Sequence, residues 1–207
     1  MKQLTSFRAL TYLGCLALAA AALLSGVDQL TRERIEQANN ARAKASLTAL
    51  LPQIDFNNDL LNDVIKLQLP GFDQPAQVYR ARLSGQPVAA VFDLVTPHGY
   101  SGDIRLMVSV NADAEIILAR VVSHRETPGL GDKIEIERND WINNFSGQSL
   151  NRTPSGRWAP DRRGGDFDTL TSATITSAAV IEAVHSALQA FVQTAPEELW
   201  RAAAAAP

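Results

Sequence analysis

The feature that most restricts the fold of this chain is an uncharged, apolar run near its N-terminus, from Ala9 to Val27. The run is rich in Leu and Ala, and its length is close to the roughly 20 residues that a helix needs to cross a bilayer core. Lys2 and Arg8 precede it, and positive residues tend to stay on the cytoplasmic side of a membrane. The run therefore predicts an N-terminal transmembrane helix, with the rest of the chain outside the cytoplasm.

A cleaved signal peptide is the alternative interpretation of this run. The string Ala19-Ala20-Ala21 resembles a signal-peptide cleavage site. The apolar run continues past that string and is long for a signal core, which favours a retained anchor. Cys15 lies within the run after a poor lipobox, so we interpret it as a small apolar residue of the span.

Composition excludes several kinds of function. The single cysteine leaves no internal disulfide framework and no cysteine-ligated iron–sulfur or zinc site. The histidines are scattered without metal-ligand spacing, so we expect no metal site; they are His98, His124 and His185. The formal net charge of -3 argues against nucleic-acid binding, which usually needs a basic excess. Any redox chemistry must therefore come from a bound organic cofactor.

Short apolar segments in the middle of the chain predict an antiparallel sheet. These segments are separated by turn residues and lie at 78–83, 88–95, 104–110 and 115–123. Before them, a helix is predicted over 28–51, with Asp28 as its cap and Pro52 at its end, and we interpret it as a solvated stalk. A short helix is predicted at 141–145, and apolar residues at helical spacing follow Thr174. Strands followed by helices indicate an α+β domain.

The stretch Asp168–Thr174 joins a loop rich in Gly and Arg to the C-terminal helix. By itself, a cluster of hydroxyls before a helix is most often an N-cap. A helix start also gathers unpaired backbone N–H groups and the positive end of the helix dipole, which together favour a phosphate. A Thr hydroxyl in that field is able to hold a phosphate by hydrogen bonds or by a covalent ester.

This stretch resembles the flavinylation motif of the FMN-binding domain family, in which Asp, two free positions, Ser or Thr, usually Gly, and Ala-Thr precede a helix. The resemblance implies that Thr174 carries FMN through a phosphoester, with Ala173 beside it. It also implies that Asp168 assists attachment by orienting the substrate or its metal, and that Thr171 and Ser172 hydrogen-bond the phosphate. Ser172 stands where the family usually has Gly, so we expect the loop to differ slightly.

Two further loops, at 99–102 and 126–131, resemble other motifs of the same family. From their own residues both are ordinary turns, since Gly and Pro interrupt regular structure. In the family these loops form the pocket around the flavin. Glycine lets backbone amides approach a flat ring closely, and Glu and Thr side chains are expected to hydrogen-bond its polar edge. The residues implied to contact the cofactor are Tyr100, Ser101, Glu126, Thr127, Leu130 and Gly131.

The length, the predicted span and the three motifs together resemble the G subunits of Rnf/Rsx ion-translocating electron-transport complexes. This resemblance implies a redox subunit that is not catalytic alone, anchored in a bacterial inner membrane with its soluble domain on the periplasmic side. The implied partners are the other subunits of the complex and a flavin transferase that uses FAD and Mg²⁺. Two alternatives remain open: the C subunit of a sodium-translocating NADH:quinone reductase, and a periplasmic binding or assembly module without redox function.

The expected domain layout follows from these segments. Residues 1–27 form a cytoplasmic tip and transmembrane anchor, and residues 28–76 form a helical stalk and linker. The FMN-binding domain is expected over 77–195, as an antiparallel sheet with flanking helices. Residues 196–207 are expected to form a C-terminal tail, in which the alanine run 202–206 is expected to be frayed.

Overall fold

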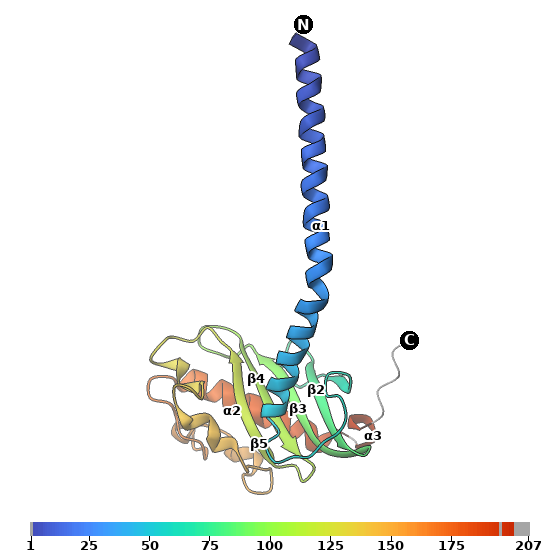
Figure 1. The fold of residues 1–207 in the computed structure, drawn as a ribbon. Helices are drawn as coiled ribbons and strands as arrows, with labels where there is room; N and C mark the ends of the chain where they lie inside the picture. The colour runs from blue at the N-terminus through green and yellow to red at the C-terminus, as the bar shows by residue number, and fades with distance from the viewer. Residues whose placement is uncertain (1, 195, 201–207) are drawn as a thin grey trace. The chain divides into compact units, whose positions relative to one another are not determined.

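The computed structural model describes residues 2–194 and 196–200, and the chain divides into two compact units, Met1–Ala43 and Lys44–Pro207. The first unit is part of helix α1 (Lys2–Ala49), which is blue in Figure 1. The second unit combines a five-stranded antiparallel sheet with helices (Figure 1). The α+β class predicted from the sequence is therefore confirmed.

Helix α1 runs without a break through residue 28, so the prediction that Asp28 caps a separate helix is wrong. Large apolar side chains are exposed along its apolar stretch, namely Leu16, Leu18, Leu23 and Leu24. At 100° of rotation per residue, these leucines lie around the whole helix. A helix that is apolar on all sides needs apolar surroundings, which the first unit does not supply. The side chains of Lys2, Arg8 and Cys15 lie outside the described residues.

Among the residues that the structure describes, the helix that is long and apolar enough to cross a membrane is α2 (Thr174–Gln193). More than half of α2 is buried inside the second unit, and Ile181, Val184 and Leu188 are fully covered. We therefore assign α2 to the core of the domain, which agrees with its predicted apolar face.

The sheet is a meander in which each strand pairs with the next along the chain. Its strands are β1 (Val64–Leu67), β2 (Ala76–Leu83), β3 (Gln86–Thr96), β4 (Ile104–Asn111) and β5 (Ile116–Ser123). The four predicted strands are confirmed as β2 to β5. The edge strand β1 was not predicted, because four residues carry too little alternation to be recognised.

One face of the sheet packs against α2 and against the long connection between β5 and α2. That connection contains four 3₁₀ helices: η1 (Gly131–Ile134), η2 (Asp140–Phe145), η3 (Ser155–Arg157) and η4 (Asp161–Arg163). The short helix predicted at 141–145 is confirmed as η2. An aromatic cluster fills the space between this connection and α2, and it consists of Trp141, Phe145, Trp158, Phe167 and His185.

The ring of His185 is stacked on Trp158 within this cluster, with the ring centroids 5.0 Å apart. Its buried Nε2 finds no hydrogen-bond partner in the described part of the chain, and burial lowers the pKa of His185. Both Trp141 and Trp158 are buried, as expected for core aromatic residues. The cluster therefore forms an apolar core whose burial disfavours the charged form of His185.

The other face of the sheet is covered by the end of α1 and the segment after it. Leu47, Leu50, Leu51 and Leu60 are buried there within the second unit. The predicted solvated stalk is therefore wrong for its last residues. The reason is that Leu47, Leu50 and Leu51 follow one another at spacings of three and four, so they lie on one side of the chain where α1 ends.

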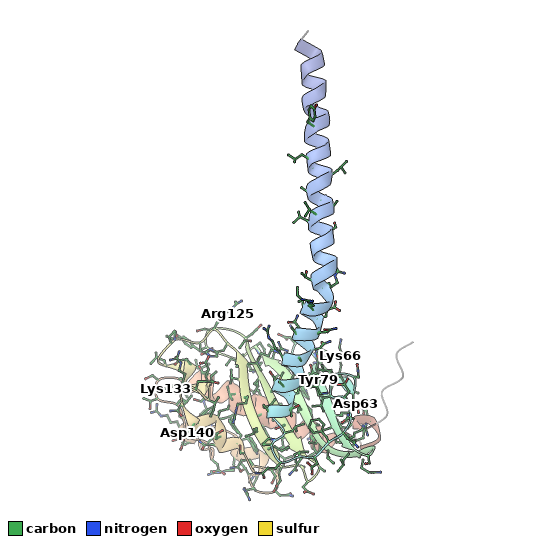
Figure 2. The ribbon with its side chains drawn as sticks, viewed as in Figure 1. Asp63, Lys66, Tyr79, Arg125, Lys133 and Asp140 are labelled. Atoms are coloured by element: carbon green, nitrogen blue, oxygen red, sulfur yellow. The ribbon has the colours of Figure 1, made fainter. Side chains whose placement is uncertain are left out.

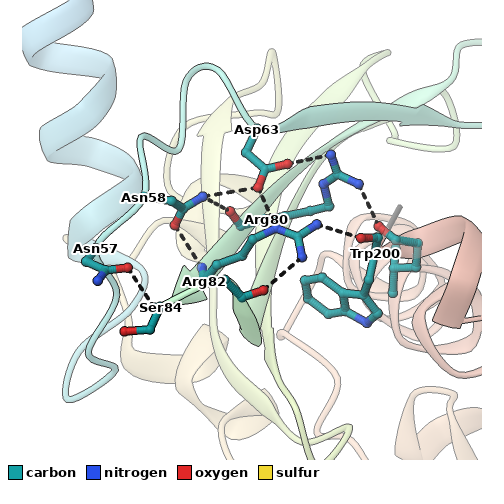
Figure 3. A network of polar contacts seen from close by, with 9 residues as sticks. Asn57, Asn58, Asp63, Arg80, Arg82, Ser84 and Trp200 are labelled. Atoms are coloured by element: carbon teal, nitrogen blue, oxygen red, sulfur yellow. Dashed lines mark hydrogen bonds and ion pairs between the residues drawn. The ribbon is translucent and has the colours of Figure 1, made fainter. Parts of the chain in front are cut away.

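A buried polar network holds the end of the described chain against β2 (Figure 3). Arg80 is fully buried, forms an ion pair with Asp63, and donates to the Leu199 carbonyl at 3.0 Å. Arg82 Nε donates to Asp63 at 2.7 Å, and its Nη2 donates to the Trp200 carbonyl at 2.7 Å. The end of α3 (Pro196–Leu199) and Trp200 are thus packed, whereas the frayed run predicted for 202–206 lies outside the described residues.

Candidate functional site

A cavity of about 410 Å³ lies where two loops meet the start of α2. Its volume falls in the range of small-molecule sites, about 300–1,000 Å³. One of the two loops lies between Arg125 and Lys133, at the end of the domain away from Asp63 and Lys66 (Figure 2). The cavity is lined by Tyr100, Glu126, Thr127, Leu130, Gly131, Ser172, Ala173, Thr174, Ile175 and Thr176.

The first turn of α2 carries unused hydrogen-bond donors. The helix begins at Thr174, and the preceding Ala173 provides no side-chain cap. Within the described residues, the backbone N–H groups of Thr174, Ile175 and Thr176 have no hydrogen-bond partner, and neither does the Thr174 hydroxyl. The hydroxyl cluster therefore does not form an ordinary N-cap. Free N–H groups at the positive end of a helix favour an anion such as phosphate.

The segment before α2 is fixed to the core at every third residue, namely Phe167, Leu170 and Ala173. Two hydrogen bonds also hold its backbone. Trp141 Nε1 donates to the carbonyl of Asp168 at 2.7 Å, and the N–H of Leu170 donates to Ser177 Oγ at 3.0 Å. The side chains of Asp168 and Thr171 are exposed between these fixed points. The core thus presents the polar residues of the motif on the surface.

Ser172 adopts a backbone conformation that suits glycine, with φ at 66°. A side chain in this left-handed region clashes with the backbone and costs on the order of 1 kcal/mol. The glycine usual in the flavinylation motif is therefore explained by the turn into α2. This chain makes the turn with a Ser, which carries the strain of the positive φ.

Glu126 connects all three segments around the cavity. Its side chain is buried, and its Oε1 accepts the backbone N–H of Ser101 at 3.0 Å. Its Oε2 accepts the hydroxyl of Thr176 in the first turn of α2. Gly131 lies so close that a Cβ there would be 2.8 Å from Glu126 Cβ. The close approach within this loop therefore requires a glycine at residue 131.

His124 supports the loop that carries Glu126 from behind. Its Nδ1 accepts the backbone N–H of Glu126 at 3.0 Å, and its Nε2 lies 2.8 Å from Glu135 Oε1. Because Nδ1 is an acceptor here, the ring proton is on Nε2 and is donated to Glu135. His124 does not line the cavity. His124 is therefore a structural hydrogen-bonder of the loop.

The structure brings most of the predicted cofactor residues into this one cavity: Tyr100, Glu126, Thr127, Leu130, Gly131, Ser172, Ala173 and Thr174. It leaves out Asp168 and Thr171, which are exposed beside it, and Ser101, which contributes its backbone N–H to Glu126. Ile175 and Thr176 were not predicted, although both line the cavity. Both residues directly follow the motif in sequence. Their position in the first turn of the predicted helix could have identified them as residues that line the site.

The cavity suits a ligand that has both a flat apolar part and a phosphate. Tyr100, Leu130 and Ile175 are apolar residues at its rim that remain 68%, 42% and 47% exposed. Such side chains gain burial when they cover an aromatic ring. The unpartnered N–H groups of α2 offer donors to a phosphate in the same cavity. These two kinds of surface match the ring and the phosphate of a flavin mononucleotide.

The chain is similar to known proteins over most of its length, including the residues that line the cavity. Residues 99–189 match the FMN-binding domain family. The chain is 40% identical over 182 residues to the G subunit of the ion-translocating oxidoreductase complex of Pseudomonas aeruginosa, covering 86% of this chain and 85% of that protein. It is also 40% identical over 191 residues to the corresponding G subunit of Yersinia pestis, covering 91% of each chain.

Among solved structures, the crystal structure of Shewanella oneidensis NqrC aligns with a TM-score of 0.44 and 19% identity, over 69% of this chain and 72% of that chain. The similarity to the two G subunits extends over most of both chains at a much higher identity. The chain therefore belongs to the family of the G subunits of ion-translocating oxidoreductase complexes, and it contains an FMN-binding domain.

Proposed function

We propose that this chain is an electron-carrier subunit of a membrane-bound ion-translocating oxidoreductase complex of the Rnf/Rsx type, with FMN held covalently on Thr174 through a phosphoester. The observation that carries the proposal is the first turn of α2. It presents a partly exposed Thr174 hydroxyl beside three unpartnered N–H groups at the wall of a cavity. The relatives are G subunits of ion-translocating oxidoreductase complexes, which supports this choice of complex and of its other subunits as partners.

Bound FMN supplies electron transfer in steps of one or two electrons. The chain contributes position and electrostatics. In this proposal, the N–H groups of Thr174 and Ile175 hold the phosphate, while Tyr100 and Leu130 cover the ring and exclude water. Thr127, which lines the cavity, hydrogen-bonds the polar edge of the ring. The chain makes no bond to a substrate in this role, so it works as a redox subunit and is not catalytic alone.

We assign the attachment step to a separate flavin transferase that uses FAD and Mg²⁺. The oxygen of the Thr174 hydroxyl forms a bond to the phosphorus on the FMN side of FAD, the bond to the AMP half breaks, and AMP leaves. The hydroxyl proton passes to a base of the transferase. Asp168 is exposed next to the acceptor, which suits a role in orienting the substrate or its metal. Thr171 and Ser172 are exposed hydroxyls that are available to the phosphate.

We place residues 1–27 in a bacterial inner membrane as a retained, single-pass anchor, with residues 28–207 on the periplasmic side. The support comes from the exposed leucines around α1 and from the basic residues before the apolar run. We assign the stalk to residues 28–43, because the packed domain begins at Lys44. Protease added to intact spheroplasts is expected to digest the domain. Full protection, or a mature protein that begins near Ala22, would refute this topology.

The attachment itself is tested on protein matured with its native export and flavin-transfer machinery. Tandem mass spectrometry of the tryptic peptide 164–201 is expected to place FMN on Thr174. Thr174→Ala is expected to remove the ultraviolet fluorescence of the denatured protein on a gel, while Thr171→Ala keeps it. An adduct on Thr171 or Thr176, or no adduct in the matured protein, would contradict the proposal.

A further inference from the structure

Two threonines of the first turn of α2 line the same cavity, and only one of them can be the acceptor of a single flavin. Thr174 is partly exposed, and its hydroxyl has no hydrogen-bond partner in the part of the chain that is described. Thr176 is 1% exposed, and its hydroxyl donates to Glu126. The two residues have the same chemistry, so the difference between them is made by their surroundings.

The surroundings of Thr176 are set by the Glu126 carboxylate. An ionised carboxylate is an acceptor only, so the Thr176 hydroxyl must be the donor in this contact. The other carboxylate oxygen accepts the N–H of Ser101 at 3.0 Å. Glu126 is itself held in place by the backbone of Gly131, which lies directly against it. Glu126 therefore ties the first turn of α2 to both loops of the cavity.

This tie also determines which hydroxyl the helix presents. Residues two apart on a helix point in different directions. With Thr176 held inward against Glu126, Thr174 is turned toward the open side of the cavity, which agrees with its partial exposure. A rotation of the first turn would exchange the two environments, and the contact with Glu126 opposes that rotation.

We propose that Glu126 is a positioning residue that makes Thr174 the flavin acceptor, because it engages the Thr176 hydroxyl and fixes the first turn of α2. This inference rests on the proposed covalent attachment. It differs from the role that the family resemblance implies for Glu126, which is a direct contact with the polar edge of the flavin. Both carboxylate oxygens already have partners within the protein.

The first test measures the initial rate of FMN incorporation into the full-length chain by its native flavin transferase, and locates the adduct by mass spectrometry. Glu126→Ala is expected to slow incorporation at Thr174 by at least tenfold, since the hydrogen bonds from Ser101 and Thr176 to the carboxylate are lost. Glu126→Gln is expected to stay close to wild type. Its amide oxygen accepts from Ser101, and its NH₂ group donates to the oxygen of Thr176.

The second test asks whether Glu126 acts through Thr176. Thr176→Val removes the hydroxyl at nearly constant volume, and it is expected to slow incorporation as much as Glu126→Ala does. The double variant is expected to be no slower than either single variant, because both break the same contact. Thr176→Ser keeps the hydroxyl and is expected to rescue the rate. Asp113→Ala, at an exposed carboxylate in the turn between β4 and β5, is the control that leaves the rate unchanged.

The third test needs no flavin. In a Thr174→Ala background, hydrogen exchange of the Ser101 amide is expected to be about tenfold faster with Glu126→Ala and nearly unchanged with Glu126→Gln. Incorporation at the wild-type rate in Thr176→Val, or additive losses in the double variant, would overturn the inference. Failure of the wild-type chain to take up FMN would instead refute the proposed function, and the exchange result would still report whether Glu126 holds the loop.

Discussion

The ion pair between Asp63 and Arg80 should contribute far more to stability than an exposed pair on the same domain. Arg80 is fully buried and Asp63 is its carboxylate partner. Asp63 also accepts from Arg82 Nε at 2.7 Å and from Asn58 at 3.2 Å (Figure 3). Asp63→Ala therefore breaks a buried ion pair by removing the carboxylate from the Arg80 guanidinium, a change that typically costs about 3–5 kcal/mol.

The cost is large when compared with the whole stability of a domain, which is about 5–15 kcal/mol. Urea unfolding of the full-length chain, followed by tryptophan fluorescence, measures it. With an m-value of about 2 kcal/mol/M, a loss of about 3–5 kcal/mol lowers the midpoint by about 1.5–2.5 M. The m-value itself should stay the same, because the surface exposed on unfolding does not change.

The matched control is Asp166→Ala. Asp166 also pairs with an arginine, Arg157, at 2.8 Å, but both side chains are about half exposed to solvent. Water and salt screen such a pair, so its loss should hardly move the midpoint. Equal midpoints for Asp63→Ala and Asp166→Ala would show that the ion pair with Asp63 does not stabilise buried Arg80. The proposal that this network holds the end of the described chain against β2 would then be wrong.

Three further changes test other parts of the domain. Ser172→Gly should raise the free energy of unfolding by up to about 1 kcal/mol, since glycine tolerates the positive φ; a lower urea midpoint would contradict this. Gly165→Ala places a Cβ on the Ala159 carbonyl and should lower both the midpoint and the covalent flavin content, whereas Gly156→Ala, with open space around its Cβ, should keep both. Burial lowers the pKa of His185, so the unfolded state takes up the proton first as the pH falls through about 6.5, and stability is lost below that pH. The midpoint of His185→Phe should therefore fall less steeply between pH 7.5 and pH 5 than that of the wild type, and equal slopes would refute the assignment.

Local patterns were enough to predict the elements that depend on neighbouring residues. Alternation and turn residues identified β2 to β5, and helical spacing identified α2. The cap predicted at Asp28 failed because a helix already under way extends at little cost, so one capping residue does not interrupt it. The end of the predicted stalk is buried because Leu47 and Leu50 meet a sheet that forms later in the chain.

The motif residues were recognisable from sequence because each motif is contiguous. Asp168 to Thr174 and the loop 126–131 could be identified without knowing that they meet. The sequence also indicated that a helix start would be available to a phosphate. It did not indicate that Ser172 takes a positive φ, since that angle follows from how the turn enters α2 between buried Leu170 and Ala173.

By itself, the sequence determined the class of the domain, the apolar N-terminal run and the chemical groups available at the site, because these depend on residues close together in the chain. Only the tertiary structure decided which of those groups are free. The partner of Thr176 is Glu126, 50 residues away, and the carbonyl that receives Arg80 belongs to Leu199, 119 residues away. Such contacts form only when the closed fold removes water from both partners, and burial of this kind cannot be derived from any local stretch of sequence.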